Sequence, residues 1–171
     1  TLAAGDLFVA IKGERFDGHD FVDAAFERGA VAALVGESRA DTIAGNLVVV
    51  REPLAALGQL AAHWRSRFSI PIIVVVGSNG KTTVKEMLAA ILRAHYGERC
   101  VLVTQGNLNN AIGLPLTLLR LRDEHVAAAI ELGIVRDRVP WIGPAAERLT
   151  QAIPRPGRAD PVHHRIGRFA V

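Results

Sequence analysis

The chain of 171 residues is poor in aromatic side chains, in cysteine and in long apolar runs. Only 5% of its residues are aromatic. Proteins that bind single-stranded nucleic acid usually stack bases on more aromatic side chains, which disfavours that class of partner. Cys100 is the single cysteine, so no disulfide can form within the chain, and we expect a reducing, cytoplasmic location. No apolar run approaches the roughly 18 residues of a membrane-spanning helix, so we expect no membrane span.

The sequence does have a globular composition, with an uneven distribution of charge. Half of the residues are hydrophobic and 22% are charged, as in ordinary folded domains. Residues 1–133 hold 13 basic and 14 acidic side chains, whereas residues 134–171 hold 7 basic and 3 acidic ones. The net charge of +3 therefore comes from the last segment, which also holds five of the eight prolines. This segment is either an anion-binding or nucleic-acid arm or a disordered or foreign terminus. We favour the second interpretation and predict an irregular tail.

Residues 1–69 predict a small α/β domain. A helix is expected over residues 20–28, where apolar side chains follow helical spacing, with Asp20 as its N-cap and Gly29 as its stop. Pro53 begins a second predicted helix. Three apolar runs predict strands, at residues 7–11, 32–35 and 47–50.

Residues 70–133 predict part of a doubly wound parallel sheet. Residues 70–76 form a β-branched run without polar alternation, which is typical of a strand buried on both faces of such a sheet. The following helix, residues 82–95, is expected to face inward through Val84, Met87, Leu88, Ile91 and Leu92. A strand is expected next at residues 101–104, followed by an Asn-rich loop at 106–113. A short helix at 114–121 and a further strand at 126–132 complete this part. Two strand–helix–strand steps indicate the α/β class.

The clearest chemical signal is the loop between the strand at 70–76 and the helix at 82–95. Its glycines let backbone amides approach phosphate oxygens, and the helix N-terminus adds positive potential. We expect Lys81 to reach the β- and γ-phosphates of ATP and the Thr82 hydroxyl to bind Mg²⁺. The first glycine of the pattern G-x-x-x-x-G-K-[ST] falls at Val75, but the strand–loop–helix context favours a nucleotide site over a simple glycine turn. The predicted nucleotide-binding residues are Gly77, Ser78, Asn79, Gly80, Lys81, Thr82 and Thr83.

A second element supports a nucleotide site. The apolar run that begins at Val126 ends in the carboxylate of Glu131. The carboxyl ends of parallel strands face the ligand crevice in open α/β sheets. We therefore expect Glu131 to hold Mg²⁺ near the triphosphate, rather than to be an ordinary solvated glutamate.

Three stretches, in this order along the chain, resemble the Mur ligases: residues 5–21, 77–83 and 104–119. The loop at 77–83 is also similar to that of the related folylpolyglutamate synthetases. The other two stretches, together with residues 84–87, resemble the member of the family that adds D-alanyl-D-alanine to UDP-N-acetylmuramoyl-tripeptide. The resemblance covers residues 5–133.

This resemblance implies an ATP-dependent amide ligase of peptidoglycan precursor synthesis. ATP would phosphorylate the tripeptide carboxylate, and the amine of D-alanyl-D-alanine would attack the acyl phosphate, releasing ADP and phosphate. Two Mg²⁺ ions would neutralise the crowded oxygens, with Thr82 and Glu131 as metal ligands. The candidate catalytic residues are Lys81, Asn107, Asn109 and Asn110; for the asparagines, an ordinary Asn-rich turn is the alternative. We expect small-molecule substrates, no nucleic acid, and a monomer for the complete protein.

The resemblance ends at Gly133. In the family, the central domain continues with more strands, a metal-binding histidine and a modified metal-holding lysine, whereas no lysine follows Gly133 here. We expect an N-terminal domain of the UDP-substrate type at 1–69, incomplete at its start, a partial P-loop domain at 70–133, and a divergent basic tail at 134–171. A truncation or reading-frame change at Gly133 would make the chain a truncated ligase, inactive by itself. A non-catalytic Mg·ATP-binding fragment and a folylpolyglutamate-synthetase-like ligase stay open, although residues 5–21 speak against the latter.

Overall fold

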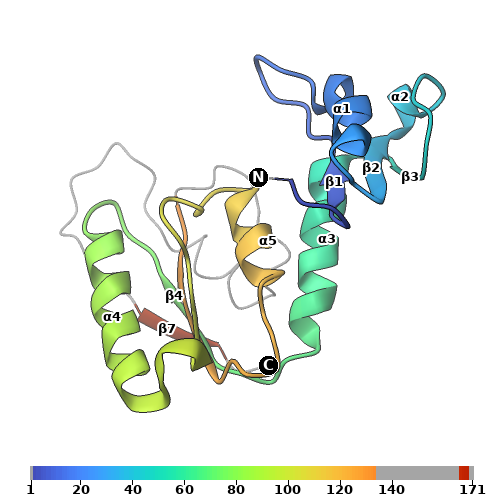
Figure 1. Ribbon diagram of the computed structural model, residues 1–171. Helices are drawn as coiled ribbons and strands as arrows, with labels where there is room; N and C mark the ends of the chain where they lie inside the picture. Colours follow the sequence, from blue (N-terminus) through green and yellow to red (C-terminus); the bar gives the residue numbers. More distant parts are fainter. Residues whose placement is uncertain (1, 134–165, 170–171) are drawn as a thin grey trace. The chain divides into compact units, whose positions relative to one another are not determined.

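The computed structural model describes residues 2–133 and 166–169 (Figure 1). Contacts within the chain divide it into two compact units, Thr1–Leu57 and Gly58–Val171. The division falls inside α3 (Pro53–Ser66), and the junction predicted near residue 69 follows the end of this helix. Among the described residues, no helix combines the length and the apolar character needed to cross a bilayer.

The first unit is a small α/β domain, as predicted. Its three strands are all parallel and lie in the order β1-β2-β3. Apolar side chains from the sheet and its helices form one small core, which includes Ala10, Val22 and Val35. The elements of this unit before α3 are β1 (Leu7–Val9), η1 (Gly18–Phe21), α1 (Val22–Glu27), β2 (Ala32–Gly36), α2 (Glu37–Ala40) and β3 (Leu47–Val50).

The start of the first helical segment differs from the prediction. Asp17, not Asp20, is the capping residue: its carboxylate accepts a hydrogen bond from the His19 amide at the start of η1. The chain forms a 3-10 turn before α1, so the helical segment begins earlier than residue 20. The Asp20 carboxylate instead accepts a hydrogen bond from Arg39, at 2.8 Å.

The second unit carries a four-stranded sheet in the order β5-β6-β4-β7. Strands β5, β6 and β4 are parallel, which confirms the predicted parallel sheet, while β7 pairs with β4 in the antiparallel sense. The elements after α3 are β4 (Ile72–Val75), α4 (Lys81–Tyr96), η2 (Glu98–Cys100), β5 (Val101–Val103), α5 (Gly113–Leu118), β6 (Ala127–Glu131) and β7 (Ile166–Phe169).

Both faces of this second sheet are covered. Figure 1 shows α4 on one side of the strands and α5 on the other. On β5, Val101 and Val103 pack in the core beneath α4, whereas Leu102 packs in the larger core that contains Leu114 and Leu118 of α5. This alternation follows from the two-residue period of a strand. It makes the sheet doubly wound, as the unbroken apolar runs predicted.

One prediction for this unit is wrong in detail. Met87 and Ile91 of α4 are 62% and 66% exposed, because Leu88, Ala89 and Leu92 are the side chains that pack on the sheet. The apolar stripe of α4 is thus wider than the face that meets β5 and β6. Strand β7 lies in the segment predicted to be irregular, where it pairs with the edge of β4. The rest of the predicted tail, residues 134–165 and 170–171, lies outside the described residues.

Candidate nucleotide and metal site

The glycine loop joins the end of β4 to the start of α4, as the sequence predicts. Gly80 lies directly before the helix with φ of 70° and ψ of 4°, a left-handed conformation that glycine adopts at low cost. A Cβ at Gly80 would meet nothing within 4 Å, so the backbone conformation rather than crowding by the protein requires glycine. Ser78 and Asn79 are exposed. The loop therefore presents its amides and the N-terminus of a 16-residue helix at the surface, an arrangement that favours anions.

Lys81 is the first residue of α4 and folds back over the loop. Its Nζ donates a hydrogen bond to the Gly77 carbonyl oxygen at 2.8 Å. The side chain is half-buried. The ammonium group thus lies beside the same loop whose amides would bind phosphate, and it adds a positive charge there. Thr83 follows in the first turn and is exposed.

Glu131 joins three segments that lie far apart in the sequence. It is the last residue of β6 and is 3% exposed. Its Oε2 accepts a hydrogen bond from Thr82 Oγ1 at 2.9 Å, and its Oε1 accepts one from Asn109 Nδ2 at 2.8 Å. The structure therefore places the two predicted metal-ligating side chains, Thr82 and Glu131, in direct contact.

The donor set of this pair fits Mg²⁺. A carboxylate and a hydroxyl are hard oxygen donors, and Mg²⁺ is commonly held by one or two carboxylates together with substrate phosphates. Within residues 2–133 and 166–169, no group of three or more His, Cys, Asp and Glu side chains forms a richer metal site. The Thr82–Glu131 pair is therefore the candidate magnesium site of the described residues, beside the loop that would hold the phosphates.

The three asparagines of the predicted site occupy different places. Asn109 contacts Glu131, and its carbonyl oxygen accepts a hydrogen bond from the Gly133 amide at 2.7 Å. The Asn110 side chain accepts hydrogen bonds from the backbone amides at the start of α5, including that of Gly113 at 2.7 Å. Asn107 is exposed. The structure thus brings one of the three side chains to the carboxylate, and another bonds backbone amides at the start of α5.

Two buried residues that the sequence did not single out are linked to the backbone of Glu131. Thr104 and Lys85 are each 1% exposed. The amide of Glu131 donates to Thr104 Oγ1 at 3.0 Å, and Lys85 Nζ donates to the Thr104 carbonyl oxygen at 2.9 Å. Lys85 Nζ also lies 2.8 Å from Glu86 Oε1, and this hydrogen bond lowers the pKa of Glu86 below its ordinary value. One signal was available in the sequence: a lysine at a position of α4 that faces the sheet.

The first unit has a polar cluster of its own. The Gly36 amide donates to His19 Nε2 at 2.9 Å, so this nitrogen carries no proton, and Nδ1–H donates to Asp17 Oδ1 at 2.5 Å. The hydrogen bond from His19 lowers the pKa of Asp17. His19 is 7% exposed. Both of its ring nitrogens are used inside the fold, which favours the structural interpretation of this histidine.

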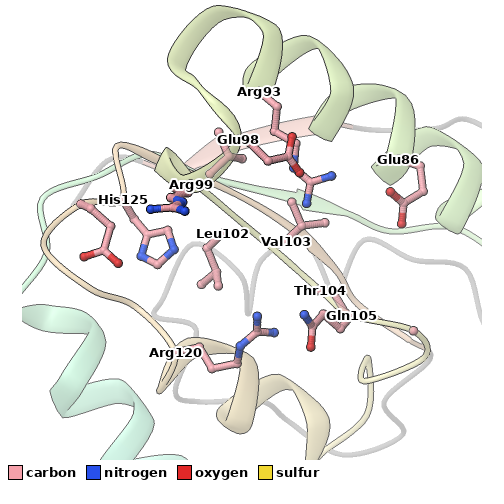
Figure 2. Close-up of a pocket in the computed structure, with 13 residues that line it drawn as sticks. Glu86, Arg93, Glu98, Arg99, Leu102, Val103, Thr104, Gln105, Arg120 and His125 are labelled. Carbon is pink, nitrogen blue, oxygen red and sulfur yellow. The ribbon is translucent and has the colours of Figure 1, made fainter.

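A cavity of about 490 Å³ lies along β5 (Figure 2). Its polar wall mixes both signs of charge, and Arg93 Nε lies 3.2 Å from Glu98 Oε1. The cavity includes neither the glycine loop nor Glu131. It is therefore separate from the candidate site. Its charged lining residues are Glu86, Arg93, Glu98, Arg99, Arg120 and Glu124.

Known proteins match the chain over most of its length. Residues 75–138 match the Mur ligase middle domain, and residues 1–65 match the Mur ligase family, catalytic domain. The UDP-N-acetylmuramoyl-tripeptide--D-alanyl-D-alanine ligases of Escherichia coli (strain K12) and Synechocystis sp. are 51% and 45% identical over 132 and 137 residues. The alignments cover 77% and 78% of this chain, but 28% and 29% of those ligases.

Solved structures agree with the sequence matches. MurF from Acinetobacter baumannii superposes with a TM-score of 0.70 at 44% identity, over 77% of this chain and 28% of that one. The MurF ligase from Thermotoga maritima, whose structure is a complex with ADP, superposes with a TM-score of 0.66 at 34% identity. That match covers 90% of this chain and 34% of the other.

The chain thus spans 28–29% of the length of these two curated relatives. The two family matches lie on the two α/β units, and the glycine loop and Glu131 both fall within the match to the middle domain, residues 75–138. The parallel sheets agree with the fold that the resemblance implied. The chain belongs to the Mur ligase family.

Proposed function

We propose that this chain is the N-terminal and ATP-binding part of a peptidoglycan-precursor ligase. The complete enzyme would join D-alanyl-D-alanine to UDP-N-acetylmuramoyl-tripeptide. The contact between Thr82 and Glu131 beside the glycine loop carries the proposal, because it assembles a phosphate loop and a metal-binding pair in one place. The names of the relatives aligned over 77–78% of the chain support this choice of substrates.

ATP supplies the phosphoryl group that turns the tripeptide carboxylate into an acyl phosphate, which the amine then attacks. The protein's own part is to position and neutralise the triphosphate. Backbone amides from Gly77 to Thr83 bind phosphate oxygens. The ammonium of Lys81 turns from the Gly77 carbonyl, which it contacts at 2.8 Å, to the β- and γ-phosphates.

Thr82 and Glu131 would hold Mg²⁺, which would supply charge neutralisation at the triphosphate. Glu131 can bind the ion with lone pairs that remain after it has accepted two hydrogen bonds. Asn109 orients the carboxylate through its hydrogen bond to Glu131 Oε1, as residues that hydrogen-bond metal ligands do. Asn107 offers an exposed amide to the phosphates or the muramoyl substrate, and Asn110 holds the shape of the same loop.

The first unit has a different proposed task. Its loop from Gly13 to Phe21 belongs to the domain that would hold the UDP end of the substrate, and His19 and Asp17 fix the shape of that loop. Because the chain spans less than a third of its curated relatives, we propose that it binds Mg·ATP without completing ligation. We also propose a cytoplasmic location and a monomeric complete enzyme.

Calorimetric titration with Mg·ATP tests this proposal. We expect the wild-type chain to bind with saturation and Lys81→Ala to lose that binding. Lys12→Ala, which removes a lysine from the first unit, is the matched control and should bind as the wild type does. A parallel assay with UDP-N-acetylmuramoyl-tripeptide and D-alanyl-D-alanine should detect no ligation by the chain alone. Absence of Mg·ATP binding by the folded wild type would overturn the proposal.

A further inference from the structure

We infer that Lys85 and Thr104 are positioning residues for Glu131, and that they set how much Mg²⁺ strengthens ATP binding. This inference rests on the proposed Mg·ATP site. It concerns two buried side chains that contact neither the glycine loop nor the proposed metal position, and it assigns them an effect on the metal-dependent part of binding.

The first observation is the burial of a lysine. Lys85 is 1% exposed, and placing a charged side chain inside a protein is costly unless it is hydrogen-bonded. Lys85 Nζ has the Thr104 carbonyl oxygen at 2.9 Å and Glu86 Oε1 at 2.8 Å. An apolar residue would pack between α4 and the sheet at lower cost. The position of Lys85 is therefore explained by its two hydrogen-bond acceptors. The buried acceptor is the carbonyl oxygen of Thr104.

The second observation is where that contact leads. Thr104 directly follows β5, and its hydroxyl oxygen accepts the hydrogen bond from the Glu131 amide at 3.0 Å. Lys85 thus fixes the main chain of Thr104, and Thr104 fixes the main chain of Glu131. The carboxylate of Glu131 then extends from a main-chain position that the hydrogen bond to Thr104 fixes.

The third observation is the spacing on α4. Thr82 and Lys85 are three residues apart and so lie on one face of the helix. Thr82 bonds the carboxylate of Glu131 directly at 2.9 Å, whereas Lys85 reaches the backbone of Glu131 through Thr104. Helix α4 and strand β6 are therefore tied together twice, once at the carboxylate of Glu131 and once, through Thr104, at its backbone amide. This arrangement sets the separation of the two metal-ligating oxygens.

The Lys85–Thr104 contact should affect the binding of Mg²⁺ and not the binding of phosphate. Mg²⁺ demands nearly ideal octahedral geometry at about 2.0–2.1 Å, so small displacements of its ligands weaken binding. Phosphate bound by the amides of the glycine loop and by Lys81 does not need the Lys85–Thr104 contact. Loss of that contact should therefore reduce the gain in ATP affinity on adding Mg²⁺, while ATP affinity without the ion is preserved.

The test compares ATP binding in MgCl₂ and in EDTA for matched pairs of variants of the full chain. Lys85→Met keeps an unbranched side chain of similar size and removes its charge, whereas Glu86→Gln removes only the charge of the exposed partner of Lys85. Thr104→Val removes the acceptor for the Glu131 amide, whereas Thr104→Ser keeps a hydroxyl. We expect the gain from Mg²⁺ to fall about ten- to hundredfold in Lys85→Met and Thr104→Val, the range typical of residues that hold a metal ligand in place. Glu86→Gln and Thr104→Ser should keep the wild-type gain.

Thermal unfolding without ligand is recorded for every variant. A purely structural role predicts a loss of ATP affinity that is the same in MgCl₂ and in EDTA. If Lys85→Met and Thr104→Val lose ATP affinity equally in MgCl₂ and in EDTA, or keep the full gain, the inference is overturned. Thr104→Val keeps the test decisive if Lys85→Met fails to fold. If the wild type binds ATP equally well with and without Mg²⁺, the proposed metal site itself is overturned. This wild-type result therefore distinguishes failure of the metal site from failure of the inference about Lys85 and Thr104.

Discussion

The two units place polar clusters at the same point of an α/β fold, but the clusters differ in what remains available to a ligand. In the first unit, β2 ends at Gly36, and His19 bonds both Gly36 and Asp17. In the second unit, β6 ends at Glu131, which accepts hydrogen bonds from Thr82 and Asn109.

The difference lies in the number of lone pairs. A neutral histidine ring has one donor and one acceptor, and His19 uses both inside the fold. An ionised carboxylate has about four lone-pair sites, and two hydrogen bonds leave capacity for a cation. The hydroxyl beside Glu131 belongs to Thr82, which is exposed. A buried polar cluster at the carboxyl end of a strand is thus a candidate ligand site when its acceptor group still has lone pairs that no hydrogen bond occupies.

Removal of the charge of Glu131 should give the largest effect. Glu131→Gln keeps the size of the side chain but supplies a neutral amide to the proposed ion. The loss of Mg²⁺-dependent ATP affinity should exceed the ten- to hundredfold that removal of a mere supporting partner costs. Fluorescence or calorimetric titration at several MgCl₂ concentrations measures it. A variant that keeps the wild-type dependence on Mg²⁺ would remove Glu131 from the site.

Removal of the polar side chain of His19 in the first unit should lower stability without changing Mg·ATP affinity. His19→Ala leaves the Gly36 amide without its buried acceptor, which costs about 1–3 kcal/mol of stability. Chemical denaturation measures that loss, and Mg·ATP affinity should be unchanged. If His19→Ala left stability intact but changed ATP affinity, the contrast between the two clusters would be wrong.

The two ends of α4 allow a third comparison. Gly80 and Gly97 flank the helix with φ of 70° and 97°, and such positive-φ conformations cost a non-glycine residue about 1–3 kcal/mol. Gly80→Ala and Gly97→Ala should therefore both lower the melting temperature. Only Gly80→Ala should also weaken ATP binding, because its methyl group would point into the space for phosphate. Equal ATP affinities for the two variants would contradict the placement of the loop.

The smallest expected effect is an acid-dependent one at Glu86. Its pKa is lowered in the folded chain by the hydrogen bond from Lys85, so the stabilisation from this pair is present above the ordinary pKa of 4.5. It is lost as the pH falls through the lowered folded-state pKa. Because Glu86 is exposed, the difference should be about 0.2–1 kcal/mol. Unfolding between pH 7 and pH 3 should show a shallower acid dependence for Glu86→Gln, and an unchanged slope would contradict the pairing.

Much of this arrangement could be predicted from local sequence signals. The β-branched run before the glycine loop and the alanine-rich run that ends in Glu131 each indicate a strand without reference to the rest of the chain. The carboxyl ends of parallel strands face the ligand crevice, which predicted Glu131 near the loop. That rule was enough to predict that Thr82 and Glu131 would lie close together.

The rest depends on long-range contacts that no local pattern contains. Nothing near Lys85 in the sequence specifies Thr104 as its partner, since the contact spans 19 residues and two elements. The roles of neighbouring Asn109 and Asn110 are equally hidden, because one turns toward β6 and the other toward the start of α5. Met87 and Ile91 were misplaced because helical spacing identifies an apolar stripe but not how much of it the sheet covers.

The central claim is that Glu131 holds a divalent ion beside ATP. Mn²⁺ prefers the same oxygen ligands as Mg²⁺, so electron paramagnetic resonance can follow its binding to the ATP-loaded chain. We predict tight binding of Mn²⁺ by the wild type in the presence of ATP, and a marked loss of this binding in Glu131→Gln at saturating ATP. Equal Mn²⁺ affinity in the two ATP-loaded proteins would contradict it.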